Sequence, residues 1–381
     1  MEFALTDEQR ALQDAVRSYL RDRFGPTQVR AVYEDPTGDG DPSELWKAIG
    51  EQGWAAVLVP EEHDGIGLGL LDASVIARVF GSGTVPGPWL GTILAGEAIR
   101  LGGSAAQQAA WLPRIASGEV KGAVAIHRPG SSPIAANAPA TAEGGKLSGT
   151  LQLVDYAEVA DVLVVATADG LYLVDPKDGA LGITRCQSLD RTTRLSTVEL
   201  NGVAGERLEQ SSPEVLQELI DRAAVLVAND LVGIARKALT ETVDYDKTRV
   251  QFGKPVGSFQ AIKHDLADLH VAVTMAEHAA TYAAFAVDTD RDDKTLAVSI
   301  AKSKAADTAR KATSDMIQYH GGIGFTWEHD AHFYFKRAKR LEYAYGDAAQ
   351  HRERIASLLL DNAADRGHLQ VDGPEMAVGQ A

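Results

Sequence analysis

The hydrophobic pattern of this chain changes its period twice, and this limits the possible folds more than any other feature. Residues 1–120 contain apolar residues at helical spacing, in segments separated by Gly and Pro clusters. Residues 121–208 contain short runs such as VLVVAT and LYLVD, which are typical of strands. The helical period returns within residues 209–365. This order excludes a doubly wound α/β fold, in which strands and helices alternate throughout.

Capping and breaking residues indicate where the helices begin and end. Thr6 followed by Gln9 has the pattern of a capping box, and the first helix is expected to stop at Gly25-Pro26. Further short helices are expected around 45–53, 72–80, 90–101 and 105–116. Four long C-terminal helices with short connections predict an antiparallel bundle, at 213–248, 258–288, 294–320 and 331–361. Residues 366–381 lack periodicity and are expected to form a mobile tail.

Length and composition are those of a globular protein with two or three domains. The 381 residues are 45% hydrophobic and 24% charged, which is enough to form several apolar cores. The formal net charge of −16 argues against nucleic-acid binding, which needs clustered Lys and Arg. The single cysteine, Cys186, excludes an intramolecular disulfide and is expected to act as a small, partly buried hydrophobic residue.

The sequence predicts a cytoplasmic location without membrane insertion. The first residues have acidic side chains among apolar ones and lack the basic start and apolar run of a signal peptide. No apolar run reaches the roughly 18 residues that a membrane-spanning helix needs. A single cysteine also fits a reducing compartment.

A glycine pattern in the first domain has two interpretations. GIGLG at residues 65–69 follows the apolar run AAVLVP and is similar to a dinucleotide-binding loop. However, its third glycine is misplaced and no further βαβ unit follows. A plain tight turn is therefore the preferred interpretation.

Two C-terminal segments resemble the signatures of the acyl-CoA dehydrogenase family. They are YDKTRVQFGKPVGSFQAIKHDLADLH, residues 245–270, and IQYHGGIGFTWEHD, residues 317–330. Their order and separation fit the family, as does the helical, β and helical organisation. The resemblance covers the chain through about residue 361 and implies the family's fold. This fold has an N-terminal helical domain, a middle β-barrel-like domain and a C-terminal four-helix bundle. The Ala-rich, Lys-poor composition fits a branch from high-GC bacteria.

Six residues in these segments suit a flavin dinucleotide. A pyrophosphate needs a fixed cation and approachable backbone N–H groups, which one arginine and two glycines provide. A phenylalanine ring and two glutamine amides complete the set. The resemblance implies that these residues bind FAD of the neighbouring subunit, in a homotetramer or in a heterotetramer with a related chain. Taken singly, they could instead be a helix cap, a surface ion pair and core packing. They are Arg249, Phe252, Gln260, Gln318, Gly321 and Gly322.

A cluster in the second segment is spaced like a set of metal ligands. Glu328, His329, Asp330 and His332 could approach a common ion on a helix. The third ligand position is undefined, and the family that the segment resembles uses no metal. No metal site is expected.

The resemblance implies an α,β-dehydrogenation that belongs to lipid metabolism. A carboxylate removes the α-proton of an acyl-CoA thioester while the β-hydrogen leaves as hydride to the flavin. Because the α-proton is weakly acidic, the base must be desolvated and the thioester carbonyl must accept hydrogen bonds. By resemblance, an electron-transfer flavoprotein receives the electrons. The sequence leaves the acyl group open.

The usual catalytic glutamate of the family is absent. In LEYAYGDAAQHRERIA, residues 341–356, alignment on Gly346 and Arg352 places Tyr345 at its position. Asp347 is the nearest carboxylate and the first candidate for the base, although it could equally be the N-cap of the following helix.

A second candidate lies near the start of the first bundle helix, where some relatives have their base. This candidate is Asp221, and Asp230 lies further along the same helix. Desolvation beside a thioester could raise the pKa of such an aspartate into a useful range.

The β region also departs from the family pattern. Residues 126–129 read IHRP and residues 153–155 read LVD, where the family commonly has Thr-Glu-Pro and Trp-Ile-Thr beside the flavin ring.

The leading hypothesis is an FAD-dependent acyl-CoA dehydrogenase, or a subunit of one, with Asp347 as base. The first alternative is a non-catalytic partner subunit that completes flavin sites on a related chain. The second alternative is a flavin monooxygenase or oxidase of the same architecture.

Overall fold

The computed structural model describes residues 5–127 and 139–360. Six α-helices precede the strands: α1 (Asp7–Arg23), α2 (Pro26–Glu34), α3 (Ser43–Glu51), α4 (Leu70–Ser82), α5 (Trp89–Gly102) and α6 (Ala105–Ala116). A short 3-10 helix, η1 (Glu61–His63), lies between α3 and α4. The predicted tail, residues 366–381, lies outside the described residues. No helix in the described ranges is long and apolar enough to cross a membrane.

The N-terminal capping box is confirmed, whereas α2 was not predicted. The Gln9 N–H donates to Thr6 Oγ1 at 3.2 Å, and the Thr6 N–H donates to Gln9 Oε1 at 3.1 Å. Pro26 ends the first helical run but also opens α2, because proline is favoured at the first position of a helix. The sequence prediction used Pro26 only as a stop.

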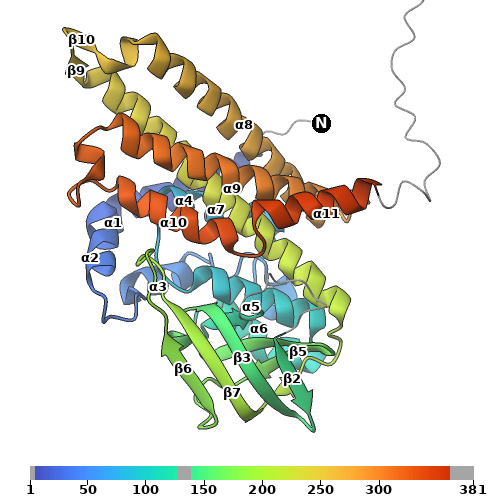
Figure 1. Ribbon diagram of the computed structural model, residues 1–381. Coiled ribbons are helices and arrows are strands. Elements are labelled where there is room, and N and C mark those ends of the chain that lie inside the picture. Colours follow the sequence, from blue (N-terminus) through green and yellow to red (C-terminus); the bar gives the residue numbers. More distant parts are fainter. Residues whose placement is uncertain (1–4, 128–138, 361–381) are drawn as a thin grey trace, which may run out of the picture.

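The middle strands form one mixed sheet below the helices in Figure 1. The long antiparallel pair β3–β7 lies next to the edge strand β6, and β1 pairs with β4 in parallel. Its order is β6-β7-β3-β2-β4-β5-β8. The strands are β1 (Gly122–Ala125), β2 (Ala140–Glu143), β3 (Lys146–Asp155), β4 (Val162–Thr167), β5 (Gly170–Val174), β6 (Leu181–Arg185), β7 (Leu195–Ala204) and β8 (Glu206–Arg207). A 3-10 turn, η3 (Ala157–Val159), follows β3.

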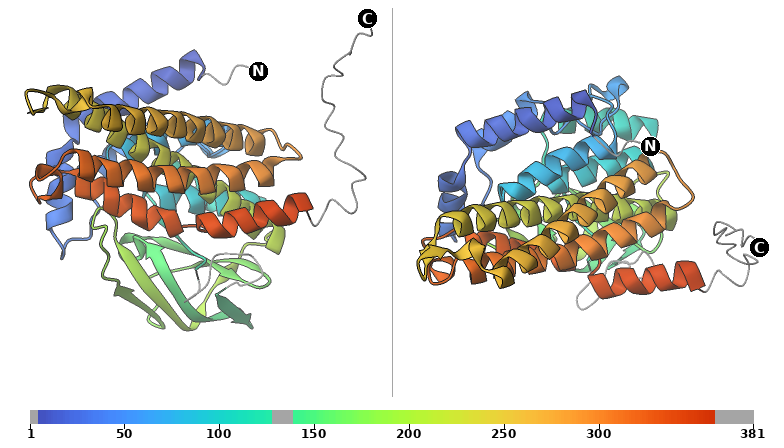
Figure 2. Two further views of the ribbon diagram at one scale, coloured as in Figure 1. Left: turned by 45° about the horizontal axis from the view of Figure 1, so that its top comes forward. Right: turned by 90° about the horizontal axis from the view of Figure 1, so that it is seen from above.

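The C-terminal region is a bundle of long helices, seen from two further sides in Figure 2. The predicted fourth helix, 331–361, is wrong as one element, since residues 344–347 break it into α10 and α11. A small hairpin and two 3-10 turns lie at one end of the bundle. The elements are α7 (Pro213–Thr248), β9 (Val250–Gln251), β10 (Lys254–Pro255), η4 (Val256–Ser258), α8 (Gln260–Asp288), α9 (Lys294–Tyr319), η5 (Ile323–Phe325), α10 (Ala331–Tyr343) and α11 (Ala348–Leu360).

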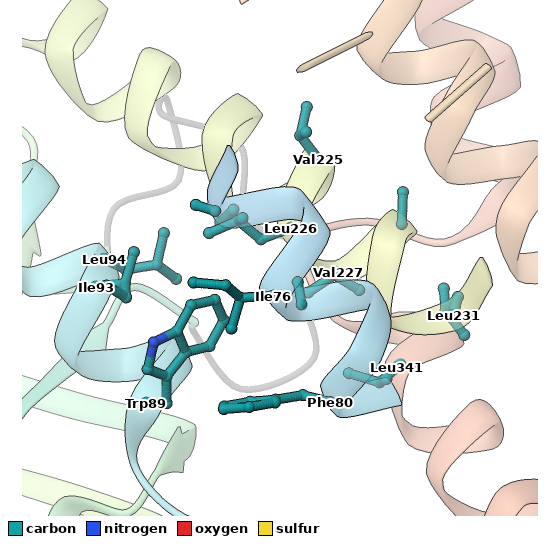
Figure 3. Packing of buried hydrophobic residues seen from close by; sticks show 14 of the residues in the cluster. Ile76, Phe80, Trp89, Ile93, Leu94, Val225, Leu226, Val227, Leu231 and Leu341 are labelled. Atoms are coloured by element: carbon teal, nitrogen blue, oxygen red, sulfur yellow. The ribbon is translucent and has the colours of Figure 1, made fainter. Parts of the chain in front are cut away.

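Glycines let α4 and α7 touch through their backbones. A Cβ on Gly81 would lie 2.1 Å from the Asp230 carbonyl oxygen, and one on Gly233 would lie 2.0 Å from that of Arg78. Side chains of α4, α5 and α7 then fill the adjoining core, where Figure 3 shows Phe80 facing Trp89. The ring centroids of this pair are 5.1 Å apart. The first domain and the bundle therefore form one continuous apolar core.

Candidate functional site

A cavity of about 690 Å³ lies between the sheet and the C-terminal helices. Its floor comes from β1, β3 and the loop after β6, and its wall comes from α10 and the turn before α11. The lining residues that matter below are His127, Gln152, Leu153, Asp155, Asp190, Lys336, Lys339, Arg340, Tyr345 and Asp347. His127 is the last described residue of the IHRP segment. The cavity is large enough for the ring system of a cofactor.

Two buried basic side chains hold the turn at residues 344–347 in place. Lys302 of α9 donates to the Gly346 carbonyl at 2.7 Å and to the Glu342 carbonyl at 3.0 Å. His351 Nε2 lies 3.0 Å from the Tyr345 carbonyl. Burial lowers the pKa of Lys302 to about 7 and that of His351 to about 4. Because His351 is neutral, its Nε2 must carry the proton that it donates.

The contacts of Lys302 and His351 with this turn, which we call the clamp, hold Tyr345 in a left-handed backbone conformation. Tyr345 has φ of 55° and Gly346 has φ of 97°, and a helix cannot continue through such angles. The Tyr345 side chain therefore turns toward the sheet, where its ring centroid lies 5.3 Å from that of His127. Burial lowers the pKa of His127 to about 4 and raises the pKa of Tyr345 above its usual value. Both groups are neutral near pH 7, so neither supplies the charge of a carboxylate base.

Asp347, the first candidate for the base, caps α11. Its carboxylate accepts the Gln350 N–H at 2.8 Å, and its own N–H donates to Gln350 Oε1 at 2.9 Å. The side chain lies at the edge of the cavity and is half-buried. The N-cap interpretation therefore describes what this carboxylate does in the structure.

Asp221, the second candidate, is engaged elsewhere. Arg354 of α11 binds its two oxygens in a bidentate pair at 2.6 and 2.9 Å, and Gln217 donates to it at 3.1 Å. It is not among the residues that line the cavity. The structure thus joins α7 to α11 through Asp221 and does not bring it to the turn with Asp347.

Buried ion pairs that the sequence analysis missed lie between the cavity and a second, much smaller one that shares Asp155 and Arg340 with it. Arg337 donates to Asp230 at 2.6 Å and to the Val85 carbonyl at 2.8 Å. Arg340 pairs with Asp190 at 2.8 Å and lies 3.8 Å from Asp155.

These pairs leave almost no free space behind the cavity. Only about 30 Å³ remains between α4, α5, α7 and α10, which is room for one or two water molecules. The side chains of Asp230 and Arg337 are 9% and 7% exposed. A signal was present in the sequence, because Asp230 interrupts an apolar stretch of α7 and Arg337 and Arg340 lie three residues apart on one face of α10.

The six residues predicted to hold a dinucleotide lie in two segments at one end of the bundle (Figure 1). The rings of Tyr245 and His320 stack at 4.4 Å and thereby join the end of α7 to the end of α9. All six residues, from Arg249 to Gly322, are exposed. We call them the dinucleotide half-site.

The half-site has the chemistry that a pyrophosphate and an aromatic ring require. Arg249 forms no ion pair with any residue in the described ranges, so its charge is available. A Cβ on Gly321 or Gly322 would meet nothing within 4 Å, which leaves their backbone open to a ligand. The Phe252 side chain is 91% exposed at a left-handed position of the hairpin turn. These residues fit one end of a flavin dinucleotide.

The half-site and the cavity lie at opposite ends of α10. This helix has 13 residues, so its ends are about 20 Å apart. The cavity and the half-site are therefore two separate regions of this chain.

The remaining sequence patterns have structural explanations. The glycine turn at 65–69 is a tight turn, as predicted, since the N–H groups of Ile66, Gly67 and Leu68 donate back to residues 56–59. In the 328–332 cluster, Asp330 pairs with Arg30, and His329 Nδ1 accepts the Ala331 N–H at 3.1 Å. Among the described residues, no group of three or more suitable side chains could hold a metal.

The helical, β and helical organisation, the cavity and the half-site together define a flavin-dependent oxidoreductase. Residues 6–119 match the model of the acyl-CoA dehydrogenase N-terminal domain, and residues 214–360 match that of the C-terminal domain. The chain belongs to the acyl-CoA dehydrogenase family, whose cofactor is FAD. This confirms the resemblance and the fold that the two signature segments predicted.

Relatives in curated collections and among solved structures agree with this assignment. The chain is 34% identical to acyl-CoA dehydrogenase IpdE2 of Mycobacterium tuberculosis, over 87% of its length and 91% of that protein. It is 30% identical to FadE34 of the same organism, over 98% of its length and 50% of that protein.

Two similar structures carry the names of two chains. The Tcur3481-Tcur3483 steroid ACAD G363A variant has a TM-score of 0.86 at 29% identity, covering 94% of this chain and 99% of that one. The ChsE4-ChsE5 complex from Mycobacterium tuberculosis has a TM-score of 0.85 at 27% identity, with the same coverage.

Proposed function

We propose that this chain is the non-catalytic subunit of a heteromeric acyl-CoA dehydrogenase. In this role it supplies the dinucleotide half-site to an FAD whose ring lies in a related chain, and that chain binds the acyl group. The observation that carries the proposal is the ion-pair cluster of Asp230, Arg337, Arg340 and Asp190. This cluster lies behind the cavity, and we infer that an acyl chain bound there would need the same space, which we call the acyl space.

The charged cluster is a stronger barrier than an apolar filling would be. To admit an acyl chain, Arg337 and Asp230 would have to separate inside the protein, and breaking such a buried pair costs about 3–5 kcal/mol. The residues at and near the position of the usual catalytic base also argue against catalysis by this chain. Tyr345 is neutral, and the Asp347 carboxylate already caps a helix.

In this proposal, a neighbouring chain completes the FAD site. The flavin, when bound, accepts the hydride, while this chain's residues hold the dinucleotide: Arg249 the pyrophosphate, the glycines its approach, and Phe252 the apolar contact. The six half-site residues are exposed, whereas buried ion pairs fill the acyl space. A structure at 27% identity is of the ChsE4-ChsE5 complex, and one at 29% identity carries the two names Tcur3481 and Tcur3483, which supports a heteromeric assembly. By the same similarity, we propose an electron-transfer flavoprotein as the electron acceptor of the complex.

A self-sufficient dehydrogenase with Asp347 as base remains the alternative. One observation favours it, namely that Asp347 lies on the wall of the cavity. In that case the capping interaction would have to break for the carboxylate to reach a substrate.

The experiment removes one half-site at a time from the complex with a related chain. Arg249→Ala should lower the FAD content and weaken FAD binding by about 10–100-fold, since a charge-assisted contact contributes about 1.5–3 kcal/mol. Arg17→Ala is the matched control, because Arg17 is also exposed and without an ion pair among described residues. An unchanged FAD content in Arg249→Ala would contradict the proposal.

A further inference from the structure

Asp246 is a buried carboxylate without a partner, and it lies one turn before the half-site arginine. Asp246 is 1% exposed, and neither of its carboxyl oxygens has a hydrogen-bond partner among the described residues. The Ser258 hydroxyl, at the end of η4, is also buried and unpartnered. Buried polar groups are nearly always hydrogen-bonded, so two orphans at the base of one hairpin call for an explanation.

The 3-10 turn η4, which follows the hairpin that carries Phe252, packs directly against Asp246. A Cβ on Gly257 of η4 would lie 3.0 Å from the Asp246 carbonyl oxygen and 3.3 Å from its Cβ. The Val256 N–H donates to the Arg249 carbonyl at 2.8 Å and so closes the hairpin base. A movement of η4 away from α7 would therefore displace the hairpin that carries Phe252 and disturb the backbone of Arg249, whose own N–H donates to the Tyr245 carbonyl of α7 at 2.8 Å.

Within the part of the chain that the structure describes, no cation interacts with the Asp246 carboxyl. From α9, the Tyr319 phenol interacts with it electrostatically, but that hydroxyl already donates to Asp265 of α8, which in turn pairs with Lys311. From the hairpin, the Lys254 ammonium lies 4.3 Å from the Phe259 ring centroid and forms no ion pair with a described residue.

Burial alone therefore decides the charge of Asp246. It raises the pKa of this carboxyl from 3.8 to about 6. The seated hairpin prefers the neutral acid, whereas water prefers the carboxylate.

We propose that Asp246 is a positioning residue for the dinucleotide half-site: as the neutral acid it lets η4 seat on α7, and as the carboxylate it releases the hairpin that carries Arg249 and Phe252. The consequence for FAD binding rests on the function proposed above. The hairpin movement itself does not. If opening exposes the carboxyl to water, its equilibrium constant rises about tenfold from about pH 5 to about pH 8.

Hydrogen exchange tests this directly on the full chain in the assembly that it forms. Exchange of the amides of residues 249–259, corrected for the intrinsic pH dependence, should rise about tenfold between about pH 5 and about pH 8. In Asp246→Asn, which keeps the shape but cannot ionise, the corrected rate should not change with pH. Asp244→Asn should behave as the wild type, because Asp244 is exposed on the same helix and pairs with exposed Lys247.

A second variant separates seating from charge. Gly257→Ala should raise exchange in the hairpin at every pH, because its Cβ meets the backbone of α7. The same pH profile in the wild type and in Asp246→Asn would overturn the proposal. FAD retention by the complex is measured in parallel. If exchange follows pH but FAD retention does not, Asp246 positions the hairpin but not the half-site, and this too overturns the proposal as stated.

Discussion

Replacing Arg337 by Met tests how much the buried ion pair of Arg337 and Asp230 contributes to the stability of the protein. Arg337 donates two hydrogen bonds to Asp230, at 2.6 and 3.3 Å, and one to the Val85 carbonyl. Without the guanidinium, the Asp230 carboxylate stays in a site where its side chain is 9% exposed, and it keeps only its electrostatic interaction with Arg340. Breaking a buried pair in this way costs about 3–5 kcal/mol of unfolding free energy.

Urea unfolding measures this loss as a lower midpoint at unchanged slope. Arg236→Met is the matched control, since Arg236 pairs with Glu277 at 2.5 Å but with side chains that are 31% and 23% exposed, and it should cost about 1 kcal/mol or less. Asp230→Leu combined with Arg337→Met should recover most of the loss, because neither member of this pair is then left as an unpaired buried charge. A cost below about 1 kcal/mol for Arg337→Met alone would refute this reasoning.

Three further predictions concern the turn before α11. Lys302→Met should flatten the pH dependence of stability, because burial lowers the pKa of this lysine from 10.5 to about 7. The unfolded wild type then binds one proton more than the folded state between about pH 7 and about pH 10, so its stability rises over this range. Thermal melts measure this rise, and an equal rise in the variant would count against the prediction. Asp347→Ala should cost about 1 kcal/mol by loss of the cap, measured by urea unfolding, and should leave flavin reduction in the complex unchanged. Tyr345→Glu restores the usual residue of the family. It should still give no flavin reduction by acyl-CoA in this chain, because the ion pairs continue to fill the acyl space. Bleaching of the flavin by a thioester would show that the missing base was the sole obstacle.

The fold followed from the sequence because its signals are local and repeated. Changes of hydrophobic period located the helical and β regions, and the Thr6 capping box fixed the first helix start. One of the two errors was local, and the other depended on a distant residue. Pro26 can stop one helix and start the next, and the break at residues 344–347 depends on a clamp by Lys302, which lies more than 40 residues away in the chain.

The candidate site was only half accessible to sequence reasoning. The half-site consists of two short motifs, so Arg249 and Gly321 could be named in advance. The closed acyl space could not, because Asp230 and Arg337 are 107 residues apart and only the packing of α7 against α10 joins them. A lone aspartate in an apolar helix indicates a buried partner but does not identify it.

The central claim is that this chain completes a flavin site but does not itself oxidise an acyl-CoA. The most direct measurement is the flavin absorbance of the chain purified alone and supplied with FAD, before and after anaerobic addition of a panel of acyl-CoA thioesters. We predict no bleaching by any thioester in the chain alone, and bleaching once a related chain is added. Full bleaching of the chain alone, abolished in Asp347→Ala, would contradict the account and establish a self-sufficient dehydrogenase.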